Sequence, residues 1–134
     1  MEDNPKTPLG EPVFRKEKGL RHLFAAARYS MQGVERLWQE AAFRQEVLAF
    51  AIGLVILITI GAPLVHYLTF FVLMMLLFAV EALNTAIEEI VDRVSPEFSS
   101  VGRHAKDLGS LAVFCLLLAN GVFAIYAIVA NLLF

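Results

Sequence analysis

Four polar residues near the middle of the chain have the spacing of one helical face. Glu81, Asn84, Glu88 and Asp92 stand at i, i+3, i+7 and i+11, so a helix would carry them in a single row. An apolar run precedes them, and a carboxylate beside apolar surface is costly unless it faces protein or a polar partner. Such a group can serve as a general base, and Glu81 is the candidate. The alternative is that the row only begins the charged end of an apolar helix.

Glu40 is a second candidate carboxylate, far from this row in the sequence. Arg36 and Arg44 stand four residues before and after it, which is typical of a solvent-exposed ladder of ion pairs on a helix. Glu40 could instead bind a hard cation, because two carboxylates from different helices suit Mg²⁺ that nucleotide phosphates also hold. Spacing alone favours the ladder and leaves metal binding open.

Two further pairs at helical spacing follow a polar connection. Arg103 and Asp107 are four residues apart, and so are Lys106 and Ser110. The first pair is typical of a surface ion pair, with a functional role as the alternative. Lys106 and Ser110 could reach a phosphate or a substrate hydroxyl.

The sequence lacks the motifs of several other chemistries. It has no G-x-x-x-x-G-K-[ST] or G-x-G-x-x-G loop, and its histidines and its one cysteine lack the spacing of a zinc or haem site. Cys115 lies in an apolar run, and a single cysteine forms no intramolecular disulfide. We expect His66 to be an interfacial residue in a turn and Asn120 to hydrogen-bond across helices.

Long runs without charge predict the elements that position these residues. The chain has 134 residues, enough for one domain, and 58% are hydrophobic, against roughly 45–50% in soluble domains. No Asp, Glu, Lys or Arg occurs in the 34 residues 47–80 or in the 27 residues 108–134. A bilayer core takes about 20 apolar residues per helix. The runs predict an all-α integral membrane protein, and a net charge of −2 does not indicate nucleic acid binding.

The chain is expected to form a tail, a surface helix and three spans. Residues 1–18 hold three prolines and mixed charges, which predicts a disordered cytoplasmic tail. Apolar residues at steps of three and four over 19–45, with arginines largely off that stripe, predict an amphipathic helix on the membrane surface. Separated by breakers at Gly61-Ala62-Pro63 and Ser95-Pro96, the expected spans are about 47–61, 64–88 and 108–132.

The positive charges predict an orientation in the membrane. All eleven Lys and Arg precede the first span or lie in the connection between the second and third. By the positive-inside rule, the N-terminus and the 93–107 connection are cytoplasmic and the C-terminus lies on the far side. The 17 residues from Leu64 to Val80 extend about 25 Å, so Glu81 is expected near the cytoplasmic edge of the hydrocarbon. Glu88 then lies about 10 Å farther out.

Three segments resemble the signature of the small prokaryotic diacylglycerol kinases. They are Glu81-Ala-Leu-Asn84-Thr-Ala-Ile-Glu88-x-x-Val91-Asp92, Glu40-Ala-Ala-Phe-Arg44-Gln-Glu46 and Gly102-Arg-His-Ala-Lys106-Asp107-Leu-Gly-Ser110. The similarity extends in order over about residues 19–134. It implies an ATP- and Mg²⁺-dependent kinase that converts diacylglycerol to phosphatidic acid in the bacterial inner membrane. It also implies a homotrimeric helical bundle whose active sites are shared between neighbouring subunits.

The same resemblance implies roles for individual residues. Glu81 corresponds to the catalytic base that takes the proton from the lipid hydroxyl, supported by Asn84, and Glu40 and Glu88 correspond to ligands of the metal on the ATP phosphates. The nucleotide-binding residues implied are Arg21, Tyr29, Glu40, Glu88, Glu97, Lys106 and Asp107. The lipid-binding residues implied are Ser30, Arg44, Glu46, Glu81 and Ser110. The interval from Tyr29 to Glu40 is one residue shorter than in the family, so the family's arginine before the tyrosine corresponds to Arg21 or is replaced by His22.

Two other functions remain open on the sequence. Some members of the family prefer undecaprenol, although Asp92-Arg93 and the segment Gly102–Ser110 are closer to the diacylglycerol-specific, Gram-negative type. A non-enzymatic membrane oligomer that conducts ions would need polar residues distributed along a span. The polar residues here cluster at one end, with Asn120 the main exception, which favours the kinase.

Overall fold

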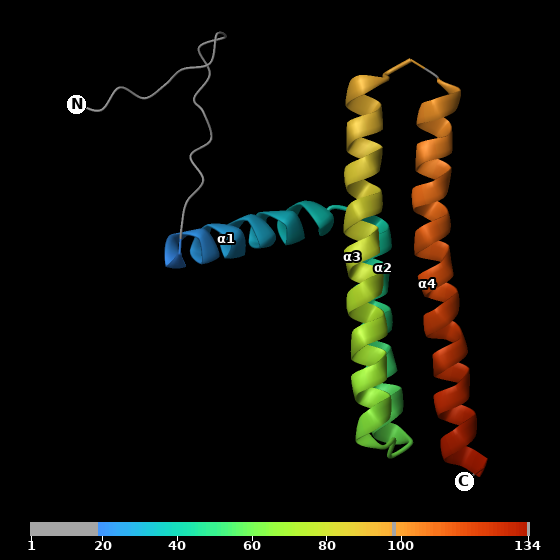
Figure 1. Ribbon diagram of the computed structural model, residues 1–134. Helices are drawn as coiled ribbons and strands as arrows, with labels where there is room; N and C mark the ends of the chain where they lie inside the picture. The colour runs from blue at the N-terminus through green and yellow to red at the C-terminus, as the bar shows by residue number, and fades with distance from the viewer. Residues whose placement is uncertain (1–18, 98, 134) are drawn as a thin grey trace. The chain divides into compact units, whose positions relative to one another are not determined.

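The computed structural model describes residues 19–97 and 99–133, and all regular structure in that part of the chain is helical. The helices in order are α1 (Leu20–Leu37), α2 (Ala41–Thr59), α3 (Leu64–Val94) and α4 (Ser100–Leu133) (Figure 1). The expectation of an all-α protein is confirmed. The tail expected over 1–18 lies outside the described residues.

The chain divides after Glu35 into two units. The described part of the first unit is Gly19 and most of α1. Gly19 has φ +72°, a left-handed conformation that suits glycine, and its carbonyl accepts hydrogen bonds from the amides of His22 and Leu23 as the helix begins. The apolar side chains of Leu23 and Phe24 are exposed. A place for α1 on the membrane surface stays a prediction.

The single helix expected over 19–45 is interrupted at Trp38–Glu40. The amide of Gln39 donates to the Arg36 carbonyl at 3.1 Å, and the amide of Glu40 donates to the Leu37 carbonyl at 3.0 Å. Glu40 then adopts an extended backbone, with φ −77° and ψ 130°, and α2 begins at the next residue. No Gly or Pro marks this break, so the apolar periodicity runs through it unchanged.

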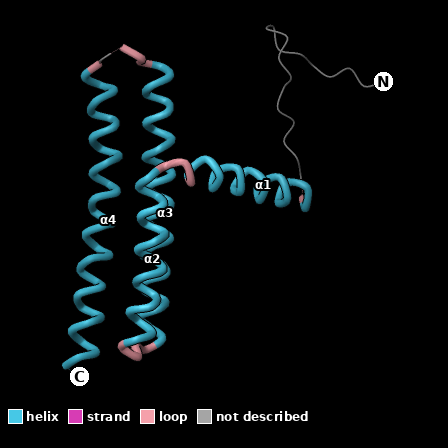
Figure 2. Tube along the Cα trace, turned by 180° about the vertical axis from the view of Figure 1, so that it is seen from behind, coloured by secondary structure: helices cyan, strands magenta, loops and turns pink. Residues whose placement is uncertain are grey.

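The helices α2, α3 and α4 are each long and apolar enough to cross a membrane, which confirms three spans. The protein is therefore an integral membrane protein. The helices extend beyond the expected spans, since α2 starts before residue 47, α3 continues to Val94 and α4 starts at Ser100. Figures 1 and 2 show α3 and α4 side by side and antiparallel, with α2 packed on α3.

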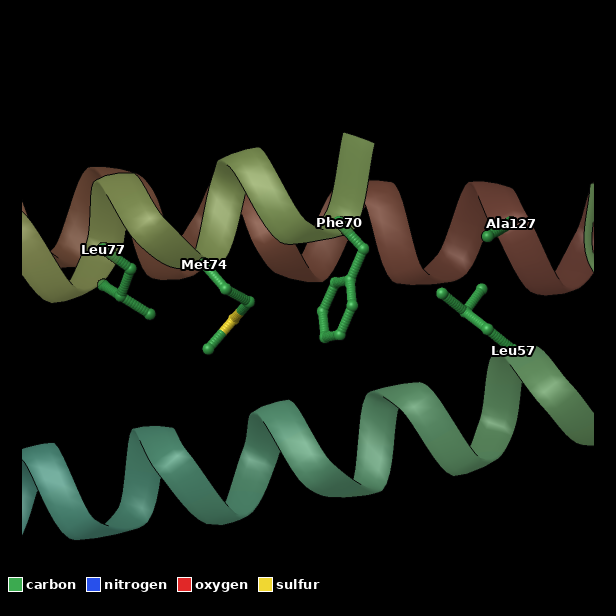
Figure 3. Packing of buried hydrophobic residues seen from close by; sticks show 5 residues of the cluster. All are labelled: Leu57, Phe70, Met74, Leu77 and Ala127. Carbon is green, nitrogen blue, oxygen red and sulfur yellow. The ribbon is translucent and has the colours of Figure 1, made fainter. Parts of the chain in front are cut away.

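A small apolar core joins the three spans in the half of the bundle near the α2–α3 turn. Figure 3 shows its members, Leu57 of α2, Phe70, Met74 and Leu77 of α3, and Ala127 of α4. Gly53 allows α2 to approach, because a Cβ there would lie 2.3 Å from Cζ of Phe70. Most other apolar side chains of the spans are exposed on this single chain. Such surfaces face lipid or another subunit in a membrane.

Polar contacts also join α3 and α4. The Asn120 Nδ2 donates to the Leu116 carbonyl at 2.9 Å and to the Leu73 carbonyl of α3 at 3.4 Å, which confirms the expected bond across helices. His66 is not simply interfacial, because it is buried and its Nδ1 lies 3.1 Å from Nδ2 of Asn131. These two residues are 65 positions apart, so no local pattern could relate them.

Candidate active site

The polar row on α3 divides into a buried part and an exposed part. Glu81 and Asn84 are buried, with 5% and 9% of their surfaces exposed, and Glu88 is half-buried one turn later. The Asn84 Nδ2 donates a hydrogen bond of 3.0 Å to Oε1 of Glu88. Asp92 is exposed, and its Oδ1 lies 2.5 Å from Nζ of Lys106 on α4. Glu81, Asn84 and Glu88 therefore share a face as predicted, whereas Asp92 forms a separate ion pair with Lys106.

Five of the predicted site residues line a single cleft. It lies where the start of α2 meets α3 and α4, and we call it the carboxylate cleft. Its predicted members are Glu40, Glu81, Asn84, Glu88 and Ser110, and Ala42, Thr85, Val113, Phe114 and Leu117 complete the lining. It joins three carboxylates to an apolar wall, so a polar reacting group and a hydrocarbon chain can both be accommodated.

Arg36 connects two carboxylates beside this cleft. Its Nη1 donates to Oε1 of Glu40 at 2.7 Å, and its Nε donates to Oε1 of Glu89 on α3. These bonds, first that to Glu40, raise the pKa of Arg36 above its ordinary value. The ion pair predicted between Arg36 and Glu40 is thus present, whereas Arg44 donates to the Trp38 carbonyl at 3.4 Å.

Two buried polar atoms near the cleft find no hydrogen-bond partner among the described residues. They are Oε2 of Glu46, a residue 5% exposed on α2, and Oδ1 of Asn84. Buried polar atoms are normally hydrogen-bonded, so an atom without a partner needs an explanation, such as a ligand or a second subunit. Phe43 is also buried here and packs against Phe78 of α3 with ring centroids 5.2 Å apart, which holds the start of α2 in place.

A second cleft lies at the connection between α3 and α4, and we call it the connection cleft. It is lined by Glu97 and Lys106, two of the predicted nucleotide-binding residues, and by Val91, Asp92, Ser95, Pro96, Ser99, Gly102 and Arg103. The Ser99 Oγ accepts a 3.0 Å hydrogen bond from the amide of Gly102 in the first turn of α4. Asp107 is exposed, outside the residues that line either cleft.

The remaining predicted residues belong to the first unit, on α1. Ser30 Oγ donates to the Ala26 carbonyl at 3.0 Å, and the guanidinium carbon of Arg28 lies 5.6 Å from the ring centroid of Tyr29. Arg21 also lies on this helix, and the roles predicted for Arg21, Tyr29 and Ser30 stay predictions.

The donor set fits a magnesium ion held jointly with phosphates. Residues 19–97 and 99–133 contain no cluster of three metal-ligating side chains, so they form no closed protein cage. Mg²⁺ commonly takes one or two carboxylates and completes its shell with water and substrate phosphates. Glu40 and Glu88 line the same cleft, and of the described residues that line it none is Lys or Arg. A cation bound there would offset the repulsion between a polyphosphate and the three carboxylates of the cleft.

Comparison with known proteins identifies the family. A family model described as prokaryotic diacylglycerol kinase matches residues 28–128. The chain belongs to this family. It is 55% identical over 114 residues to a diacylglycerol kinase of Sinorhizobium sp., covering 85% of this chain and 83% of the relative. The corresponding protein of Escherichia coli strain K12 is 38% identical over 96 residues, covering 71% and 79%. That of Haemophilus influenzae is 33% identical over 108 residues, covering 80% and 92%.

Membership in the prokaryotic diacylglycerol kinase family makes the chain a kinase enzyme and confirms the resemblance found in the sequence. One contact beside the site of this kinase could not be expected from the sequence. Arg36 and Glu89 are 53 residues apart, and spacing along a single helix cannot relate them. Glu89 has no predicted role in the site, and it links α3 to the residue that pairs with Glu40.

Proposed function

We propose that this kinase transfers the γ-phosphoryl group of ATP to the hydroxyl of 1,2-diacylglycerol, giving phosphatidic acid and ADP at the cytoplasmic membrane face. The observation that carries the proposal is the carboxylate cleft, where Glu81, Asn84 and Glu88 of α3 meet Glu40 at the start of α2 beside an apolar wall. Relatives named diacylglycerol kinase support the choice of lipid.

Glu81 is proposed as the general base. It is buried where the apolar part of α3 ends, so its carboxylate faces the depth at which a lipid hydroxyl arrives. As the lipid oxygen forms its bond to the γ-phosphorus, the hydroxyl proton passes to Glu81. The bond from that phosphorus to the bridging oxygen breaks, and ADP leaves with the electron pair.

Glu40 and Glu88 are proposed to hold Mg²⁺ on the ATP phosphates. When bound, the ion neutralises phosphate charge and fixes the phosphates in line with the acceptor. Asn84 orients Glu88 through the 3.0 Å hydrogen bond, and Arg36 restrains Glu40 through the 2.7 Å bond. The rise of α3 separates Glu81 from Glu88 by about 10 Å, which leaves room for the acceptor and the phosphoryl group between base and metal ligand.

The other site residues follow the same layout. Glu97 and Lys106 of the connection cleft are proposed to contact the nucleotide, together with Arg21 or His22, Tyr29 and Asp107. Ser110 lines the carboxylate cleft beside Phe114 and Leu117, which suits a lipid with a polar head and acyl chains. Glu46, Arg44 and Ser30 are proposed to bind the same lipid, and the unpartnered Oε2 of Glu46 supports a ligand at that position.

The proposed assembly is a homotrimer in the bacterial inner membrane, with residues 19–134 as one membrane domain after a cytoplasmic tail. Cytoplasmic placement of the N-terminus and the α3–α4 connection is supported by the positive charges, which avoid the α2–α3 turn and the C-terminus. The many exposed apolar side chains of the single chain leave surface for contact with further copies, and the number of three subunits rests on the family resemblance.

The proposed function is tested by phosphate incorporation from labelled ATP into lipid by the purified protein in mixed micelles. Diacylglycerol and undecaprenol are offered side by side, with Glu81→Gln as the control. Labelled phosphatidic acid that depends on Glu81 supports the proposal. Labelled undecaprenyl phosphate would instead assign the protein as an undecaprenol kinase. Absence of a Glu81-dependent product in folded protein would overturn the proposal.

A further inference from the structure

Gly109 of α4 lies so close to Asn84 of α3 that a Cβ there would displace the Asn84 side chain. A Cβ at position 109 would be 2.2 Å from Oδ1 of Asn84 and 3.3 Å from its Cγ, and real Cβ atoms do not approach a neighbour within 3.0 Å. Gly121 on the same helix has no described neighbour within 4 Å of the equivalent point. Gly102, nearer the start of α4, has a less severe close approach, 2.9 Å from Cγ1 of Val91. The contact of Gly109 is therefore the one that involves a residue of the carboxylate cleft.

The two ends of the Asn84 amide have different surroundings. The Oδ1 end lies over Gly109, buried and without a hydrogen-bond partner among the described residues. The Nδ2 end donates to Oε1 of Glu88 at 3.0 Å. Reversal of the amide would bring its oxygen against the Glu88 carboxylate, where two acceptors repel. The space over Gly109 thus accommodates the oxygen while the nitrogen orients Glu88.

We propose that Gly109 is a positioning residue for Glu88, acting through the side chain of Asn84. The inference rests on the proposed role of Glu88 as a metal ligand. A methyl group at position 109 would displace the Asn84 amide, and Glu88 would lose the hydrogen bond that restrains it. Groups that orient a metal ligand typically affect metal affinity by about 10–100-fold. The expected defect therefore lies in divalent metal binding more than in turnover at saturating metal.

The test is a double-mutant cycle in the full-length protein. Gly109→Ala is made in the wild-type and Asn84→Ala backgrounds, with Gly121→Ala as the matched control on α4. Mn²⁺ binding is followed by electron paramagnetic resonance with a non-hydrolysable ATP analogue, and kinase rate is titrated against Mg²⁺. We expect Gly109→Ala to weaken Mn²⁺ binding and to raise the half-saturating Mg²⁺ concentration about tenfold, with Gly121→Ala unchanged.

The Asn84→Ala background separates this role from general helix packing. After truncation no Oδ1 remains to collide, and the Asn84 Cα would lie at an ordinary 3.7 Å from the new methyl group. Gly109→Ala is therefore expected to have little further effect on metal binding in that background. If Gly109→Ala alone does not fold, recovery of folded protein in the double variant supports the same steric contact.

Three results would overturn the inference. They are an unchanged Mn²⁺ affinity in Gly109→Ala, an equal loss in both backgrounds, and failure of both variants to fold. A different result concerns the proposed function itself. If Asn84→Ala keeps wild-type metal binding and activity, the supporting role of Asn84 fails, and the role of Gly109 fails with it.

Discussion

Neighbouring carboxylates on α3 have different partners although their sequence context is similar. Glu88 lines the carboxylate cleft and accepts a hydrogen bond from Asn84, whereas Glu89 is exposed and accepts one from Arg36. A rotation of about 100° per residue turns adjacent helical side chains to different sides. The pair therefore offers an internal control, since the same chemical change can be made inside and outside the cleft.

Glu81→Gln is expected to reduce turnover by about 10²–10⁴-fold, because the amide cannot accept the proton of the lipid hydroxyl. The side chain keeps its size, so the fold and the proposed oligomer should persist. Initial rates in mixed micelles and the oligomer mass by light scattering check the two parts. Loss of the oligomer with the activity would instead indicate a structural role for this buried carboxylate.

Glu88→Gln is expected to raise the Mg²⁺ concentration for half-maximal rate by at least about tenfold, because a neutral amide is a poorer ligand for a hard cation. Glu89→Gln is the adjacent change outside the cleft, and its amide oxygen can still accept the hydrogen bond from Arg36, so the Mg²⁺ titration should stay close to that of the wild type. An unchanged titration in Glu88→Gln would count against metal ligation.

At the scale of the elements, the α2–α3–α4 core lies in one half of the bundle and the carboxylate cleft in the other. Leu77, 1% exposed, is the core residue nearest in sequence to Glu81. Four residues separate them, one turn of α3. The apolar contacts below the cleft therefore fix the part of α3 from which Glu81 projects.

Leu77→Ala is expected to destabilise the folded protein at the lower end of about 2–5 kcal/mol. Packing contacts are lost and a cavity remains, whereas lipid or detergent removes the cost of exposing apolar surface to water. Leu76→Ala is the matched control, since Leu76 is adjacent and 49% exposed. Thermal unfolding in detergent, followed by circular dichroism, compares the two. Equal shifts of the midpoint would show that Leu77 is not part of a packed core.

The sequence predicted those features that depend on the residue pattern within a single helix. The charge-free runs predicted three spans, and the spacing of Glu81, Asn84 and Glu88 predicted their common face. The break before Ala41 was missed because no Gly or Pro marks it and Glu40 reorients the chain through ψ alone. The contact of Gly109 with Asn84 could not be predicted from local patterns either, because the role of a glycine in a helix depends on which side chain of another helix it contacts.

At the scale of the whole molecule, the distribution of charge predicts how the bundle sits in the membrane. An impermeant maleimide should label a cysteine at Phe134→Cys in intact spheroplasts, and one at Thr7→Cys only after lysis, in a Cys115→Ser background. Labelling is read by gel shift. The reverse pattern would place the carboxylate cleft on the side without ATP and would contradict the proposed kinase reaction.

The unequal lengths of the three spans have a consequence for the lipid environment. At 1.5 Å per residue, the 19 residues of α2 extend about 28 Å, close to the thickness of a bilayer's hydrocarbon, whereas the 31 residues of α3 extend about 46 Å. We expect the short helix to set the depth of the bundle, because its length matches the hydrocarbon, while the longer one carries Glu81 and Glu88 at fixed heights. Under the proposed mechanism, the thickness of the bilayer then sets the point along α3 at which the lipid hydroxyl arrives. A thicker membrane would bring that hydroxyl past Glu81 toward Glu88, so the proposed reaction is expected to depend on membrane thickness.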